Sequence, residues 1–93
     1  MTGLSTQIVV VGGGLSGLCA ARQLSSRDVD CLVLEARDRV GGRLHSAEVG
    51  NAIFDLGGQW IGPAQGRMSE LVTEFGIQTF STFHEGRSLV DQG

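Results

Sequence analysis

The stretch from Gln7 to Gly17 reads QIVVVGGGLSG and decides the fold. Its β-branched run, Gln7–Val11, is typical of a short strand buried on both faces of a parallel sheet. The run ends abruptly in three glycines, and good helix formers follow from Leu15 to about Ser26. The apolar face of this helix begins with small residues, so its first turn can lie close to a neighbouring backbone.

A second buried strand is expected at residues 31–34, CLVL, after a polar break at residues 25–28. This strand ends at Glu35. The order strand, helix, strand predicts one βαβ unit, and hence an α/β fold with a partial Rossmann-like, dinucleotide-binding unit. Two parallel strands are an incomplete doubly wound sheet with exposed edges, so we expect the unit to be marginally stable on its own.

The next segment is expected to be a loop followed by a hairpin. Residues 36–43 are polar and arginine-rich and contain the pair Gly41-Gly42, which favours a loop. Residues 44–49 and 52–56 then flank Gly50-Asn51, a suitable two-residue hairpin turn.

The last third of the chain predicts one helix and an irregular tail. Between Gly66 and Gly76 four apolar residues follow helical spacing, and Gly76 stands where a helix stops. This stripe, which we interpret as core-facing, consists of Met68, Leu71, Val72 and Phe75. Residues 77–90 alternate loosely and could begin another sheet. We therefore divide the chain into residues 1–76, the N-terminal part of a cofactor-binding domain, and residues 77–93, the truncated start of a substrate-domain segment.

The glycine-rich turn carries the main chemical signal. Gly12, Gly14 and Gly17 fit the pattern G-x-G-x-x-G directly after a buried strand and at the start of a helix. In this setting the first glycine permits a tight turn, the second removes a Cβ that would block a pyrophosphate, and the third allows the helix to pack against the strands. The N–H groups of the first helical turn, from Leu15 and Ser16 onward, then face the phosphates. The alternative is a glycine-rich connection without a ligand.

Glu35 is the candidate ribose-binding acid. It follows the second strand and stands 18 residues after Gly17, near the offset of roughly 20 expected for this role. Its carboxylate can accept hydrogen bonds from both ribose hydroxyls, and its charge disfavours a 2′-phosphate, which argues against NADP. The alternative is that Glu35 is an exposed surface glutamate. Such a residue would have no reason to stand at the end of an apolar strand.

Composition excludes several other functions. The chain has 93 residues, a net charge of −3 and no basic stripe, so nucleic acid is a poor candidate partner. We interpret Cys19 and Cys31 as small core residues, and His45 and His84 have no partner at metal spacing, so no metal site is expected. No apolar stretch is long enough to span a membrane, and no signal peptide is evident, which favours a cytoplasmic location.

Two further motifs resemble a known family. Residues 35–43, EARDRVGGR, look like the E-A-x-x-R-x-G-G-R segment of flavin-containing amine oxidases. Residues 54–63, FDLGGQWIGP, look like the D-x-G-G-x-W/Y-x-G-P stretch of the monoamine oxidase branch. The resemblance spans about residues 7–80, with three motifs in the right order, and it favours FAD over NAD as the cofactor.

The resemblance also implies roles for single residues in the second motif. It implies that Ala36 and Arg43 contact FAD beside Glu35, while Arg39 orders the loop. From its chemistry, the Arg43 guanidinium can neutralise a diphosphate or hold a loop against the flavin. Arg37 and Arg39 could equally be solvated surface charges.

For the third motif, the resemblance implies that Gly57 and Gly58 admit the cofactor. It also implies that Gln59 and Trp60 donate to the cofactor through their backbone N–H groups. From its side chain alone, Trp60 could equally be a core aromatic.

The activity implied by the resemblance is oxidation of an amine by FAD and dioxygen to an imine or aldehyde, with hydrogen peroxide as the second product. The substrate would be a small-molecule amine. The resemblance implies that the catalytic lysine and the aromatic residues facing the flavin come later in family members. This chain has no lysine and no tyrosine, and its motifs are all expected to bind cofactor, so we assign no catalytic residue. We expect a fragment that is inactive by itself. The alternatives are a non-catalytic nucleotide-binding module, a fragment of a related FAD-dependent desaturase or protoporphyrinogen oxidase, and, less favoured, a fragment of an NAD dehydrogenase.

Overall fold

The computed structural model of the protein describes residues 3–93. The chain forms two compact units, one ending at Trp60 and the other comprising Ile61–Gly93. The first unit contains β1 (Ile8–Val11), α1 (Leu15–Ser25), β2 (Cys31–Leu34) and a β-hairpin, and the second contains one helix. The functional division at residue 76 stays a prediction.

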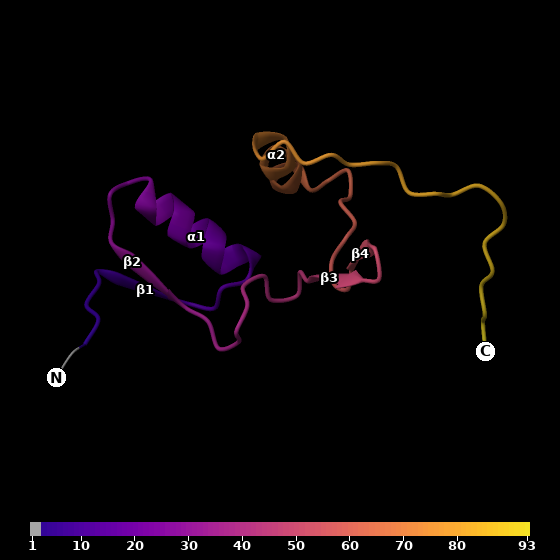
Figure 1. Ribbon diagram of the computed structural model, residues 1–93. Helices are drawn as coiled ribbons and strands as arrows, with labels where there is room; N and C mark the ends of the chain where they lie inside the picture. The colour runs from indigo at the N-terminus through magenta and orange to yellow at the C-terminus, as the bar shows by residue number, and fades with distance from the viewer. Residues whose placement is uncertain (1–2) are drawn as a thin grey trace. The chain divides into compact units, whose positions relative to one another are not determined.

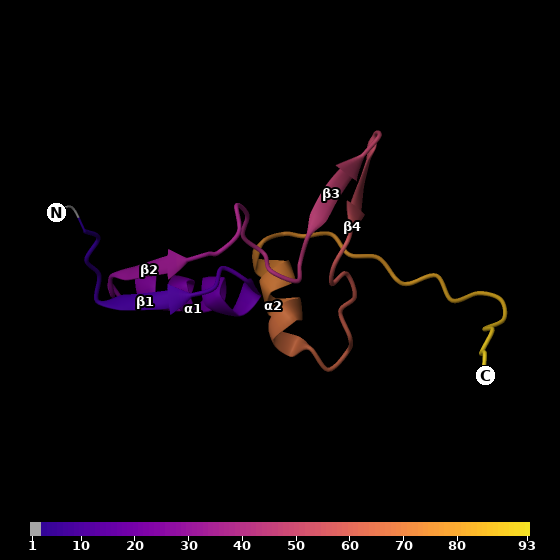
Figure 2. The same cartoon turned by 90° about the horizontal axis from the view of Figure 1, so that it is seen from below.

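The first unit begins with the expected βαβ arrangement (Figure 1). Strands β1 and β2 pair in parallel, with Ile8 opposite Cys31 and Val11 opposite Leu34. Parallel pairing requires a crossover connection, which α1 supplies. The two strands lie side by side along the helix in a second view (Figure 2). The sequence prediction of strand, helix and strand is thus confirmed.

The prediction that β1 is buried on both faces is wrong for this chain. Successive side chains of a strand point to opposite faces. Val10 is half-buried, and its Cγ1 lies near Gly17 on α1, whereas Val9 and Val11 remain 49% and 84% exposed. Because α1 covers only one face of the two-stranded sheet, the apolar side chains of the other face stay in contact with solvent.

Helix α1 ends in a Schellman arrangement. Asp28, with φ of 57°, is in the left-handed region, and its N–H donates to the carbonyl of Ser25. The next N–H, from Val29, donates to the carbonyl of Leu24. These two bonds satisfy carbonyls that the helix end would otherwise leave unpaired, and they direct the chain back into β2.

The predicted hairpin is also present. Strand β3 (Ser46–Val49) pairs antiparallel with β4 (Ala52–Asp55). At the turn, Gly50 has φ of 63° and Asn51 does not have positive φ, which matches a type II′ turn. The Ser46 hydroxyl donates to Asp55 Oδ1 at 2.7 Å across the first pair, so Asp55 has a structural role.

The second unit consists of α2 (Gly66–Glu74) and flanking irregular chain. Gly76, with φ of 63°, ends the helix as predicted, and the following N–H of Ile77 donates to the carbonyl of Val72. Three members of the predicted stripe are half-buried, but Phe75 is exposed. Residues 77–93 form no regular secondary structure.

Burial is slight throughout residues 3–93. No hydrophobic side chain in this range is buried, and Gly13 is the one described residue classed as buried. Both cysteines are half-buried free thiols. Within the same range, neither helix is long and apolar enough to cross a membrane.

Candidate functional site

The glycine turn between β1 and α1 meets two other segments of the first unit. The Gly12 N–H donates to the carbonyl of Leu34 at 2.7 Å, which ties the turn to the end of β2. The Gly41 N–H donates to the carbonyl of Gly13 at 2.8 Å, and Gly14 and Gly41 form an isolated parallel bridge. The glycine turn, the end of β2 and the loop of Gly41 therefore converge at the carboxyl end of the small sheet.

The three glycines of the turn differ in how a side chain would be tolerated at each position. Gly12 has φ of 102°, a conformation that L side chains rarely adopt. A Cβ on Gly17 would lie 1.9 Å from the carbonyl oxygen of Gly12, so only glycine lets the helix start here against the strand. A Cβ on Gly14 would meet no protein atom closer than 4.0 Å. The atom at that distance is the Cα of Gly42, so a Cβ on Gly14 would make an ordinary van der Waals contact, and no atom of residues 3–93 requires glycine there.

The first turn of α1 leaves donors available next to Gly14. Its N-cap is Gly14, which has no side chain to bond the helix N–H groups, and the first turn contains no acidic residue. The N–H groups of Leu15, Ser16 and Gly17 precede the first intrahelical bond, from Leu18 to Gly14. Such a helix N-terminus attracts an anion through its free N–H groups and its dipole.

Glu35 lies immediately beside the turn. Its Oε1 accepts a hydrogen bond from the Gly13 N–H at 3.3 Å, and its Oε2 accepts one from the Arg37 N–H at 3.4 Å. Both bonds are long, and each carboxylate oxygen can accept a further donor. The carboxylate is therefore held next to the glycine turn while it keeps capacity for hydroxyl groups.

The third motif packs against the backbone of the second. The Gly58 N–H donates to the carbonyl of Arg43 at 3.2 Å, and a Cβ on Gly57 would lie 1.9 Å from that same oxygen. Leu56 donates to the carbonyl of His45 at 2.7 Å. Gly57 thus has a packing reason within the chain itself: no side chain fits between it and the backbone of Arg43.

These segments surround an open cavity of about 830 Å³. The residues that line it are Val11, Gly12, Gly14, Leu15, Ser16, Gly17, Glu35, Arg37, Gly41, Gly42, Arg43, Leu44 and Gly58. Eight of the twelve residues proposed from sequence to bind a cofactor are in this set. The Arg37 and Arg43 side chains and the Glu35 carboxylate supply its formal charges, which suits a ligand with both anionic and hydroxyl groups.

Four proposed residues do not line the cavity, namely Ala36, Gly57, Gln59 and Trp60. The Trp60 side chain is 64% exposed, so it is not a core aromatic in this chain. Their cofactor contacts stay predictions. Five residues that line the cavity were not predicted from the sequence, namely Val11, Arg37, Gly41, Gly42 and Leu44. The glycine pair was the signal that could have found two of them, because it indicated a close approach of the backbone.

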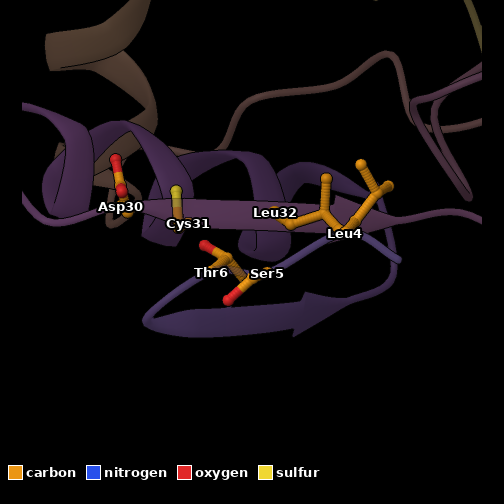
Figure 3. Close-up of a pocket in the computed structure, with 6 residues that line it drawn as sticks. All are labelled: Leu4, Ser5, Thr6, Asp30, Cys31 and Leu32. Carbon is orange, nitrogen blue, oxygen red and sulfur yellow. The ribbon is translucent and has the colours of Figure 1, made fainter. Parts of the chain in front are cut away.

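A smaller hollow of about 220 Å³ lies at the opposite, amino end of β1 and β2 (Figure 3). It is lined by Leu4, Ser5, Thr6, Asp30, Cys31 and Leu32. The Cys31 thiol donates to the carbonyl of Ala21, and the Asp30 N–H donates to the Gln7 side chain. These bonds hold the start of β2 against α1 and the segment before β1, which is a structural role.

Comparison with known proteins identifies the family. The sequence model of the flavin containing amine oxidoreductases matches residues 15–92, which is most of the chain. The chain belongs to this family. Since its members use FAD, the cofactor expected from the sequence is confirmed at the level of the family.

Individual members of the amine oxidoreductase family are closely similar. Putrescine oxidase of Kocuria rosea is 47% identical over 95% of this chain and 18% of its own length. Flavin-containing amine oxidase A of the dog, Canis lupus familiaris, is 49% identical over 78% of this chain and 14% of its own length. A solved structure of a putrescine oxidase double mutant with redesigned cofactor binding superposes with a TM-score of 0.81 and 41% identity, covering 89% of this chain and 18% of that one.

This amine oxidoreductase chain thus spans less than a fifth of the length of the curated relatives it matches.

Proposed function

We propose that the cavity at the carboxyl end of β1 and β2 binds FAD, and that the chain is the FAD-binding N-terminal portion of an amine oxidase. The observation that carries this proposal is the meeting of the glycine turn, Glu35 and the loop of Arg43 around one open space. The fit of the cofactor is supported by Gly14, which lines the cavity and carries no side chain that would keep a pyrophosphate from the backbone.

The pyrophosphate would lie at the N-terminus of α1. There the N–H groups of Leu15, Ser16 and Gly17 lack intrahelical acceptors, and no acidic side chain in the first turn opposes an anion. Arg43, on the facing loop, would add a full positive charge to the same region. The backbone around Gly12 and Gly14 approaches closely because neither residue carries a side chain.

The adenosine ribose would bind at Glu35. The carboxylate is kept close to the turn by the Gly13 and Arg37 N–H groups, and its remaining lone pairs can accept the two ribose hydroxyls. Ala36, which is exposed and follows Glu35 in the chain, would contact the adenosine. A 2′-phosphate would place negative charge against the carboxylate, so FAD fits better than NADP.

The third motif would extend the site toward the flavin ring. Gly58 lines the cavity, and the N–H groups of Gln59 and Trp60 donate to no acceptor within residues 3–93. They are therefore available to a ligand. Gly57 would act by letting this segment lie against the Arg43 backbone.

When bound, FAD supplies a two-electron acceptor that takes a hydride equivalent from the carbon next to an amine nitrogen and is restored by dioxygen with release of hydrogen peroxide. The residues of this chain bind and orient the cofactor. None of them is assigned to proton transfer or to contact with the amine, so we propose that the 93 residues alone do not turn over an amine.

The site assignment is tested by comparing FAD with FMN. The test uses the natural polypeptide, by which we mean the amine oxidase of which this chain is proposed to be the N-terminal portion. The proposed contacts are to the pyrophosphate and the adenosine ribose, so this polypeptide should bind FAD at least about 100-fold more tightly than FMN, which lacks the adenosine. Flavin fluorescence or calorimetric titration measures both affinities. Equal affinities would contradict the assignment of Glu35 and of the glycine turn.

The oxidase assignment is tested separately with a panel of primary and secondary amines. The natural polypeptide loaded with FAD should consume dioxygen and release an equal amount of hydrogen peroxide with at least one amine, and the 93-residue chain with FAD should release none. FAD binding without oxidation of any amine would favour the alternative of a non-catalytic nucleotide-binding module.

A further inference from the structure

The second half of the loop that follows β2 has a continuous run of hydrogen-bonded carbonyl groups. Every backbone carbonyl from Val40 to His45 accepts a hydrogen bond. Backbone N–H groups bond those of Gly41, Arg43 and His45. The other three, of Val40, Gly42 and Leu44, all accept from the side chain of Arg39.

The guanidinium of Arg39 spans this loop. Its Nη2 donates to the carbonyl of Gly42 at 3.0 Å, and its Nη1 donates to that of Leu44 at 3.2 Å and, more weakly, to that of Val40 at 3.4 Å. A planar fork with several fixed donors can hold such acceptors at once, whereas a lysine ammonium is a single point on a flexible stem.

The loop needs this restraint. Gly41 and Gly42 have φ of 111° and 59°, and glycine loses more conformational freedom on folding than any other residue. A Cβ on Gly41 would lie 2.6 Å from the carbonyl oxygen of Leu44, so bulkier, stiffer residues cannot replace it. The order of the loop must come from contacts made to it.

Arg39 and Arg43 have different positions relative to the cavity. Arg43 lines it, but Arg39, which is half-buried, is absent from the described residues that do. The two carbonyls on either side of Arg43, those of Gly42 and Leu44, are the ones that Arg39 holds most closely. The Arg39 guanidinium is thus placed to fix the backbone from which Arg43 projects.

We propose that Arg39 is a positioning residue that raises FAD affinity through Arg43, without contact with the cofactor. This inference rests on the proposed function, in which Arg43 faces the bound FAD. It separates two arginines of one motif by role: one carries charge to the ligand, and the other fixes the loop that presents it.

A double-mutant cycle on the natural polypeptide tests the proposal. Arg39→Lys keeps the charge but loses the fork, and it should weaken FAD binding about tenfold. Arg43→Met should weaken binding by a similar factor or more. In the Arg43→Met background, Arg39→Lys should change the dissociation constant by less than about twofold, because the residue through which it acts is gone.

Amide hydrogen exchange supplies a readout that general destabilisation would not produce. Arg39→Lys should accelerate exchange at the amide of Leu44, which bonds Gly41 within the loop, and at the amide of Gly41, which bonds Gly13 of the glycine turn. The amides of α1 should be unchanged. Arg27→Lys is the matched control. It is an exposed arginine beyond the C-terminus of α1, away from the cavity, and it should alter neither FAD affinity nor loop exchange.

The outcomes separate the two proposals. Suppose that the wild type binds FAD and that Arg39→Lys weakens binding by the same factor in the wild type and in Arg43→Met. That result would overturn the role of Arg39 and leave the FAD site intact. Failure of the wild type to bind FAD would overturn both. If Arg39→Lys is not recovered folded, Arg39→Gln, which loses the charge but keeps a planar donor group, takes its place in the same cycle.

Discussion

Two glycine-to-alanine substitutions, three residues apart, should separate folding from cofactor binding. In Gly17→Ala the new Cβ would lie 1.9 Å from the Gly12 carbonyl oxygen, and real Cβ contacts essentially never fall below 3.0 Å. The start of α1 must therefore move from the strand by about 1.1 Å, since a backbone oxygen has no rotamer to escape into. Gly14→Ala meets nothing closer than 4.0 Å, and its φ of −79° suits alanine.

Two opposing free-energy contributions decide whether Gly17→Ala stabilises or destabilises the fold. Forcing a methyl group into packed structure costs about 1–3 kcal/mol, and here the upper end applies because the opposing atom is backbone. Alanine in place of glycine within a helix returns about 1 kcal/mol. Gly17→Ala should therefore lower the free energy of unfolding by about 2 kcal/mol, and Tm with it.

Gly14→Ala should leave Tm unchanged or slightly higher. It should weaken FAD binding about ten- to hundredfold, because its Cβ occupies the space proposed for the pyrophosphate. Thermal unfolding followed by circular dichroism and FAD titration, both on the natural polypeptide, measure the two effects. An unchanged Tm for Gly17→Ala would refute the packing argument, and undiminished FAD affinity for Gly14→Ala would refute the placement of the pyrophosphate.

Substitutions at three further residues test other parts of the first unit. Asp28→Gly should raise the free energy of unfolding by about 0.5 kcal/mol, and Asp28→Val should lower it by about 1 kcal/mol, because residue 28 is in the left-handed region; urea denaturation measures both. Glu35→Gln should weaken FAD binding about tenfold while Tm changes little, since the amide oxygen can still accept the Gly13 N–H; equal affinity in a calorimetric titration would remove Glu35 from the ribose site. Gly57→Ala should destabilise the fold by about 1–3 kcal/mol, because its Cβ would lie 1.9 Å from the Arg43 carbonyl oxygen; a wild-type urea midpoint would argue against the packing of the third motif on the second.

Expectations from sequence agreed with the structure where local physics decides. The strand at residues 8–11, the helix from Leu15 and the second strand follow from side-chain shape and periodicity. The hairpin at Gly50 and the helix stop at Gly76 follow from the left-handed conformation that glycine adopts without strain. These features depend on residues close together in sequence, so reading the chain alone suffices.

Burial was the property that the sequence predicted less well. The β-branched run of β1 is typical of a strand covered on both sides, yet Val11 is 84% exposed because one helix covers one face. Trp60 likewise gives no sign in its residue type of whether it is in a core. Exposure depends on which other segments lie over a residue, and a linear pattern does not contain that information.

The sequence by itself determined the βαβ unit, the family, and which residues could bind a dinucleotide. Only the tertiary structure decided what each of those residues contacts. It distinguishes Gly14, where a Cβ would be tolerated at 4.0 Å from the nearest atom, from Gly17 and Gly57, where a Cβ would overlap a backbone oxygen. It also brings Glu35 to the N–H of Gly13, 22 residues away. The reason is physical: a motif specifies residue types, whereas contact between distant segments is set by how the strands, the helix and the loop pack together.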